Sequence, residues 1–211
     1  MEEFARILAK NAVYVAIMRQ ARRGKARQSD IKRLAKAMGT ESARVVSAQV
    51  TDGMTVEELV AILTPILKLD HDSMTELAAS LVTQMYRGEN LGLNSVRPDF
   101  DPSTVRDVAE TILEKSANGS LDSIKNDLTT YTWRQGDATM NRALQDARNV
   151  GLQVTVTRTY DGVGLHDGKD GCQWCLDRAG TWSYEEASAE GFVFARHAGC
   201  ECDISINIER R

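Results

Sequence analysis

All four cysteines of this chain lie between positions 172 and 202, and the residues before position 172 contain none. They form a Cys-x2-Cys pair, Cys172 and Cys175, and a Cys-x-Cys pair, Cys200 and Cys202, with His197 shortly before the second pair. Structural Zn²⁺ takes four thiolate or imidazole ligands in a tetrahedron, commonly at such short spacings. The clustering therefore predicts a structural zinc site that holds the C-terminal part of the chain together.

Five side chains are candidates for four coordination positions. A two-residue spacing closes a tight turn that points both ligands at one ion, and His197-x2-Cys200 repeats the spacing of Cys172 and Cys175. We therefore favour Cys172, Cys175, His197 and Cys200 as the ligands. Cys200 and Cys202 would share one face of an extended segment and could both bind, so the choice of the fourth ligand stays open.

Two alternatives remain for the cysteines. They could form two disulfides, as in secreted proteins, but Met1-Glu2-Glu3-Phe4 lacks the basic and apolar regions of a secretory signal. They could also be unligated thiols of the core. A catalytic zinc is disfavoured because the available ligands can close the coordination shell. Deaminase chemistry is excluded because neither His166 nor His197 is followed two residues later by Glu.

The net charge of −4 is unevenly distributed. Residues 1–37 contain ten Lys or Arg and three Asp or Glu, a balance of +7, which leaves −11 (−4 minus +7) for the rest of the chain. If the first helix continued past Gly24, its basic side chains could line one side and contact DNA phosphates or an acidic protein surface. A solvated face is the alternative. The candidate binding residues are Arg19, Arg22, Arg23, Lys25 and Arg27, and the basic stretch continues with Lys32, Arg33 and Lys36.

Apolar residues recur at helical spacing before about residue 151, which predicts an all-helical body. Thr55, Ser73 and Asp101 are expected N-caps, and Pro65 is expected to kink or end its helix. Asp70-His71-Asp72 then falls between two helices, where a solvated turn is favoured over a general base or a metal site. The predicted helices span about 4–18, 55–67, 73–86, 102–116, 120–134 and 137–149.

The pattern changes from Leu152 onward. Alternating residues predict strands over 152–160 and 203–208, and these two strands could pair and bracket the metal site. The glycine-rich segment 161–171 predicts a surface loop, and its His166 is favoured as a surface residue over an extra ligand. The fold class is therefore α+β, with a mainly helical body over residues 1–150 and a small zinc-stapled β module over residues 151–211.

Motifs of common enzymes are missing from the sequence. It contains no Walker-type loop, no Gly-x-Ser-x-Gly and no His-Glu-x-x-His. The longest apolar run, over residues 12–18, is far shorter than the roughly 18 to 20 residues of a membrane span. We expect a soluble protein without enzymatic activity and without a membrane partner.

The order of these features resembles the phage head morphogenesis family, the Mu F-like minor capsid proteins. The matching segments are Cys172-Gln173-Trp174-Cys175-Leu176-Asp177-Arg178-Ala179-Gly180 and His197-Ala198-Gly199-Cys200-Glu201-Cys202. The family has a Leu-Asp-Gly-like turn after its first cysteine pair and a His-Pro-Asn-Cys-Arg-Cys-like segment before a terminal strand. This chain inserts Arg178-Ala179 and replaces Pro-Asn by Ala198-Gly199 and Arg by Glu201. The resemblance covers roughly residues 137–208.

This resemblance implies a virion component without enzymatic activity. It would be present in several copies, but in far fewer than the shell protein. The resemblance also implies a location in the capsid interior or at the portal vertex, and in the host cytoplasm during assembly. The implied partners are the phage portal, the major capsid protein, or both, and packaged DNA is a further candidate. The alternative function is that of a zinc-stabilised DNA-binding protein.

Overall fold

The computed structural model describes residues 2–116, 121–160, 172–189, 193–197 and 199–210. The chain begins with helices α1 (Glu2–Lys10), α2 (Ala12–Arg22), α3 (Gln28–Ser47), α4 (Val56–Gly88), α5 (Ser103–Ser116) and α6 (Leu121–Asn149). Strand β1 (Gln153–Thr159), helix α7 (Gln173–Leu176), strand β2 (Gly180–Ser183), helix α8 (Tyr184–Ser188) and strand β3 (Asp203–Glu209) follow. The α+β fold class predicted from the sequence is confirmed.

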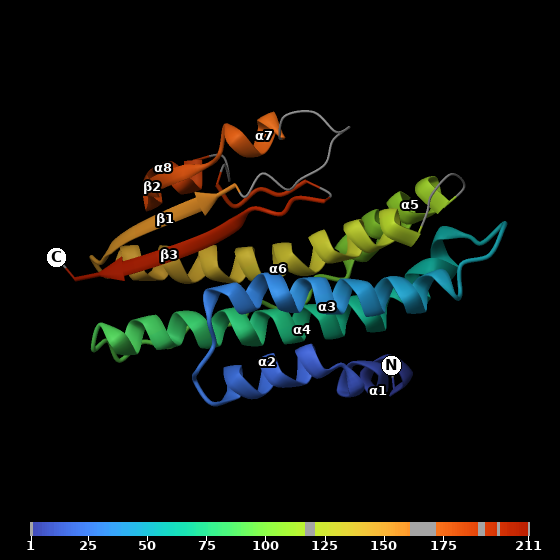
Figure 1. Ribbon diagram of the computed structural model, residues 1–211, viewed down its shortest axis with the longest axis horizontal. Coiled ribbons are helices and arrows are strands. Elements are labelled where there is room, and N and C mark those ends of the chain that lie inside the picture. The colour runs from blue at the N-terminus through green and yellow to red at the C-terminus, as the bar shows by residue number, and fades with distance from the viewer. Residues whose placement is uncertain (1, 117–120, 161–171, 190–192, 198, 211) are drawn as a thin grey trace.

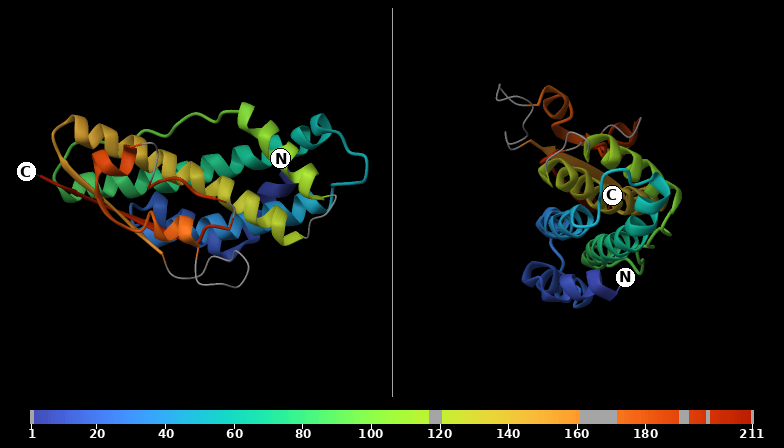
Figure 2. Two further views of the ribbon diagram at one scale, coloured as in Figure 1. Left: turned by 90° about the horizontal axis from the view of Figure 1, so that it is seen from above. Right: turned by 90° about the vertical axis from the view of Figure 1, so that its right-hand side faces the viewer.

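The elements stack in layers beneath a small sheet (Figure 1). Helix α6 lies under the sheet, α3 and α4 pack against α6, and α1 and α2 form the layer farthest from the sheet (Figures 1 and 2). No helix in the described ranges has both the length and the apolar character needed to cross a bilayer.

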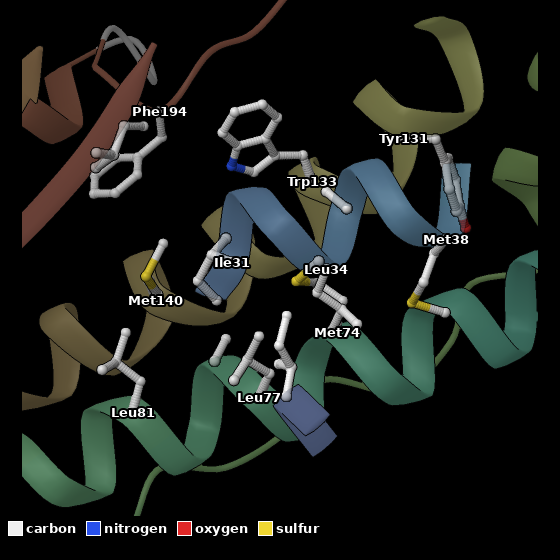
Figure 3. Close-up of a cluster of buried hydrophobic side chains, with 14 of the residues drawn as sticks. Ile31, Leu34, Met38, Met74, Leu77, Leu81, Tyr131, Trp133, Met140 and Phe194 are labelled. Carbon is white, nitrogen blue, oxygen red and sulfur yellow. The ribbon is translucent and has the colours of Figure 1, made fainter. Parts of the chain in front are cut away.

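Buried apolar side chains of α3, α4 and α6 interlock at the centre of the molecule (Figure 3). The same continuous cluster includes Phe194, Val156 of β1 and Ile206 of β3, so one core joins the helices to the sheet. The central members of this core are Ile31, Leu34, Met38, Met74, Leu77, Leu81, Trp133 and Met140. The division of the chain into two domains at about residue 150 stays a prediction.

Helices α3 and α6 approach closely at Gly39. A Cβ atom on Gly39 would lie 2.1 Å from Thr129 Oγ1 and 2.7 Å from the Thr129 Cα. Glycine inside a helix is less favourable than alanine by roughly 1 kcal/mol, but here it is the residue that lets the two backbones meet. This contact fixes α6, and α6 in turn supports the sheet.

The sheet is antiparallel, with the strand order β2-β1-β3. Val154 pairs with Ile208 and Val156 with Ile206, and all four side chains are buried. The outward positions of β1 carry Gln153 and threonines. The two strands predicted from alternation are confirmed as a pair, whereas β2 was not predicted because its four residues are too few to show a pattern.

Helix α4 is longer than the sequence suggests. It runs without a break from Val56 to Gly88 with Pro65 inside it, so the predicted end at residue 67 and restart at residue 73 are wrong. The Thr55 cap is confirmed, because Thr55 Oγ1 accepts from the Glu58 N–H at 3.2 Å. Burial along both halves of α4 outweighs the backbone hydrogen bond that proline removes.

Two further boundaries differ from the prediction. Two helices were expected on either side of Gly136, but helix α6 continues through this residue. The glycine makes room for Met74 of the core, since a Cβ atom at position 136 would lie only 3.0 Å from Met74 Sδ. The first predicted helix is instead two helices. Asn11 Oδ1 accepts from the N–H groups of Val13 and Tyr14 at 3.1 Å each and so caps α2.

The Asp70-His71-Asp72 segment lies in the middle of α4, so its predicted place in a solvated turn is wrong. Asp70 is fully buried and His71 is 3% exposed. Asp70 Oδ2 accepts from Ser42 Oγ of α3 at 2.9 Å and from Thr132 Oγ1 of α6 at 3.1 Å. Burial raises the pKa of Asp70 to about 7, although these two hydroxyl groups lower it.

This carboxyl group predicts a pH-dependent stability. Its pKa is about 7 in the folded chain and about 3.9 in an unfolded one, so the folded state holds an extra proton between these values. The free energy of unfolding therefore falls as the pH rises from about 4 to 7, by on the order of 4 kcal/mol in total. Asp70→Asn keeps the shape of the side chain and removes this dependence.

Urea unfolding at pH 5 and pH 8 is the measurement. The stability of Asp70→Asn relative to the unmodified chain is expected to rise by about 3 kcal/mol between the two pH values. Asp72→Asn, half-exposed on the same helix and paired with Lys68, is the control and should not show this rise. An equal difference at both pH values for Asp70→Asn would contradict the account.

Candidate metal centre

The cysteines and His197 meet near the end of β1 and the start of β3. Cys172 precedes α7, Cys175 lies within it, and Cys202 directly precedes β3. His197 Nε2 lies 3.3 Å from Cys172 Sγ and 3.1 Å from Cys175 Sγ. Cys175 Sγ lies 3.9 Å from Cys200 Sγ. The structure thus brings together the side chains that were predicted as metal ligands.

The two x2 spacings form similar tight turns. The Cys175 N–H donates to the Cys172 carbonyl at 2.9 Å, and the Cys200 N–H donates to the His197 carbonyl at 3.1 Å. Gly199 has a φ of +73°, in the left-handed region that glycine adopts without strain. Local backbone geometry therefore directs both ligand pairs toward one place.

All four cysteines are buried and present as free thiols, not disulfides. The candidate ligand atoms form two groups, each within 4.8 Å: Cys172, Cys175 and His197 in one, and Cys175, Cys200 and Cys202 in the other. Cys175 belongs to both groups. The cluster therefore fits a soft metal ion, and the choice between Cys200 and Cys202 as fourth ligand stays a prediction.

A buried arginine occupies the last inward-facing position of β1. Arg158 is 1% exposed, and its Nη2 lies 3.3 Å from Cys200 Sγ and 4.0 Å from Cys175 Sγ. Its Nη1 donates to the carbonyls of Val193 and Ala195 at 2.7 and 2.6 Å. The guanidinium group thus holds segment 193–195 in place and presents a positive charge to the thiols.

A second buried arginine connects the thiols to helix α6. Arg196 Nε and Nη2 donate to the two carboxylate oxygens of Asp137, the second at 3.3 Å. Its Nη1 donates to the Cys202 carbonyl at 2.7 Å and lies 3.9 Å from Cys200 Sγ. The guanidinium carbon lies 3.8 Å from the centroid of the Trp133 ring. One side chain therefore contacts both the cysteine cluster and α6.

The surroundings separate the pKa values of the cysteines. The hydrogen bond with Cys202 and the charges of Arg196 and Arg158 together lower the pKa of Cys200 to about 4, although burial acts in the opposite direction. Burial raises the pKa of Cys175 to about 11. The hydrogen bond with Cys200 raises the pKa of Cys202. The arginines thus favour one thiolate, and further thiolates need an additional cation such as a metal ion.

Charge balance favours three thiolates and one neutral histidine around a divalent ion. Such a centre carries a formal charge of minus one. Arg158, Arg196 and Asp137 together contribute plus one, so the buried assembly is neutral. Four thiolates would leave one uncompensated negative charge in the interior, which is costly. The count supports His197 as a ligand.

Aromatic side chains cover the cluster. The Trp174 ring meets the His197 ring edge-on, with 5.1 Å between centroids, and the Arg178 guanidinium lies 3.9 Å from the Trp174 centroid. Tyr160 Oη accepts from the Cys172 N–H at 2.7 Å. Trp182 lies elsewhere, in β2 opposite Val156, where it packs on the main core. His166 and segment 161–171 lie outside the described residues.

The predicted basic stretch is divided between two environments. Lys32 and Lys36 of α3 face the metal module, where Lys32 Nζ donates to the Glu201 carbonyl at 2.6 Å and Lys36 Nζ to its carboxylate at 2.7 Å. The first helix does not continue, since α2 ends at Arg22 and Gly24 has a φ of +64°. The candidate binding residues Arg19, Arg22, Arg23, Lys25 and Arg27 are all exposed.

Three charged residues of the centre were missed by the sequence interpretation: Arg158, Arg196 and Asp137. Arg158 carried a signal, because it stands at an inward-facing position of a predicted strand.

No family model, curated protein or solved structure matches this chain.

The cluster predicts about one bound Zn²⁺ per chain. Cys175→Ser is expected to abolish binding because Cys175 belongs to both ligand groups, whereas Cys202→Ser should keep the ion if Cys200 is the fourth ligand. Elemental analysis of protein purified without chelator is the measurement, and acid should release the ion as thiolates are protonated. Less than about a tenth of an equivalent in the unmodified chain would remove the proposal of a structural site.

The buried ion pair predicts that an amide substitution at Asp137 lowers the free energy of unfolding more than an amide substitution in an exposed ion pair does. Asp137→Asn leaves Arg196 unpaired in the interior and should cost about 3 kcal/mol of unfolding free energy. Glu185→Gln, which breaks the exposed pair with Arg148, should cost less than about 1 kcal/mol. Urea unfolding of the metal-loaded proteins compares them, and equal costs would contradict the assigned importance of the pair.

Proposed function

We propose that this protein is a metal-stabilised minor capsid protein of a phage head, without enzymatic activity, associated with the portal or the capsid interior. The observation that supports this most is the convergence of Cys172, Cys175, His197, Cys200 and Cys202 into one cluster directly before a terminal strand. That arrangement is the part of the chain that resembles the Mu F-like family.

We propose Zn²⁺ as the ion because thiolate and imidazole donors suit it. It would be held by Cys172, Cys175, His197 and either Cys200 or Cys202. When bound, it would crosslink α7, the turn at 197–200 and the start of β3, and its binding energy would contribute to folding. The four cysteine donors are buried, His197 is partly buried, and together they are sufficient to complete a tetrahedron, which supports a structural role over a catalytic one.

The position of the metal module also supports a structural role. It lies on a long helical body through the core around Phe194 and through Arg196. A rigid module joined to elongated helices suits attachment within an assembly. The alternative of a DNA-binding protein draws less support, because Lys32 and Lys36, which would extend a basic surface, are paired with Glu201.

Mass spectrometry of gradient-purified particles of the phage that encodes the chain tests this proposal. The protein should be present in particles at an abundance far below that of the major shell protein, and the portal should retain it in a pull-down. Cys175→Ser should reduce its incorporation, since the module would lose its crosslink. Absence from particles at every assembly stage, together with sequence-specific retention on DNA, would overturn the proposal.

A further inference from the structure

A groove of about 490 Å³ is lined by residues of α1 and α2 and by Arg23. These two helices form the layer farthest from the sheet (Figure 1). The size of the groove is within the range of about 300 to 1,000 Å³ that is typical of ligand pockets. Apolar side chains form most of its wall, and arginines line the part formed by the C-terminal half of α2. The lining residues are Ala5, Ala9, Tyr14, Val15, Met18, Arg19, Arg22 and Arg23.

The groove is formed by elements that are held in place. Phe4 and Leu8 bury one side of α1 in the core, which leaves Ala5 and Ala9 exposed one turn apart on another side. The Tyr14 hydroxyl lies 3.1 Å from Ser73 Oγ and fastens α2 to α4. Because the alanines are small, a partner's backbone can approach this wall closely.

Two of the three arginines have charge to offer a partner. Arg22 Nε is bound to Glu76 Oε1 at 2.9 Å. Arg19 and Arg23 are exposed, and no side chain of the described residues pairs with them. The groove therefore combines an apolar wall with two unneutralised cations at one end, so an occupant needs apolar groups and carboxylates on one surface.

Duplex DNA fits this surface less well than a protein does. The alanine, valine and methionine side chains of the wall offer phosphates neither a charge nor a hydrogen-bond donor. The carboxylate of Glu76, which is paired with Arg22, lies at the arginine end and would repel them. Lys32 and Lys36, which would lengthen a phosphate-binding stripe, are paired with Glu201. DNA affinity grows with the number of phosphates that are neutralised. Of the three arginines that line the groove, Arg22 is already paired with Glu76, so two remain for that purpose.

We infer that this groove binds an acidic amphipathic helix of a partner protein. Apolar side chains at helical spacing would fill the space beside Ala5, Ala9 and Val15, and carboxylates on the adjoining face would pair with Arg19 and Arg23. This surface lies apart from the metal centre. The inference goes beyond the proposed function and does not depend on it.

Fluorescence anisotropy with the full metal-loaded chain tests the inference. The probe is a labelled peptide of about 14 residues with leucines at helical spacing and glutamates elsewhere. Arg19→Glu combined with Arg23→Glu should weaken its binding at least about 10-fold. Ala9→Gln, which fills the groove without changing charge, should weaken it by a similar factor. Lys10 and Arg97 are exposed and do not line the groove. Lys10→Glu combined with Arg97→Glu is therefore the charge-matched control and should change binding less than about 2-fold.

Circular dichroism and metal content should be the same for all of these variants, so that loss of binding is not loss of folding. The inference is overturned if the glutamate peptide does not bind, or if a twin peptide with lysines in place of the glutamates binds equally well. It is also overturned if a short DNA duplex displaces the peptide and loses affinity through the same two arginine substitutions. Self-association of the chain that the Ala9→Gln variant abolishes, without peptide binding, would assign the groove to a second copy instead.

Discussion

The attachment of the metal centre to the helices depends on the buried ion pair between Arg196 and Asp137. Both residues are almost inaccessible to solvent, at 4% and 2% exposure. Removing two charges from water is expensive, and it is tolerable only where hydrogen bonds satisfy both groups. Arg196 meets this condition by donating to Asp137 and to the Cys202 carbonyl while it stacks on Trp133. Any movement of the cysteine cluster away from α6 would leave Asp137 buried without its partner.

A bound metal ion would complete this arrangement. Arg158 and Arg196 bring two positive charges to a site that holds one carboxylate, and thiolates on a divalent ion supply the missing negative charge. The ion and the ion pair therefore stabilise each other. Around this centre, Lys32 and Lys36 of α3 hold the carbonyl and carboxylate of Glu201 at the rim. A local metal crosslink would thus be joined to the packing of two long helices, α3 and α6.

Features encoded within a few residues could be predicted from the sequence. The ligand spacings, the Thr55 cap and the alternation in β1 and β3 each depend on backbone geometry over one or two turns. Features set by tertiary packing could not. Pro65 and Gly136 carry local signals for a helix end, but burial against neighbouring helices overrides them. The same burial places Asp70 in the core.

The ion pair at the metal centre was beyond local prediction for a related reason. Arg196 and Asp137 are separated by 59 positions, and nothing near either residue indicates the other. Arg158 is the exception, because a charged residue at an inward position of a strand next to a cysteine cluster indicates a buried partner. The candidate ligands were found because the chemistry of thiols and imidazole is visible in residue types alone.

Hydrogen exchange of the chain with and without its metal ion tests the central claim most directly. If the centre is fastened to α6 through Arg196, removal of the ion by a chelator should increase exchange in β1, in β3 and in α6 around residues 133–137. The part of α4 around Leu77 belongs to the main core with residues of α3 and α6 (Figure 3), whereas the cysteines form a separate cluster. It should therefore keep its protection. Unchanged exchange around residues 133–137, or an equal rise throughout α4, would contradict the account.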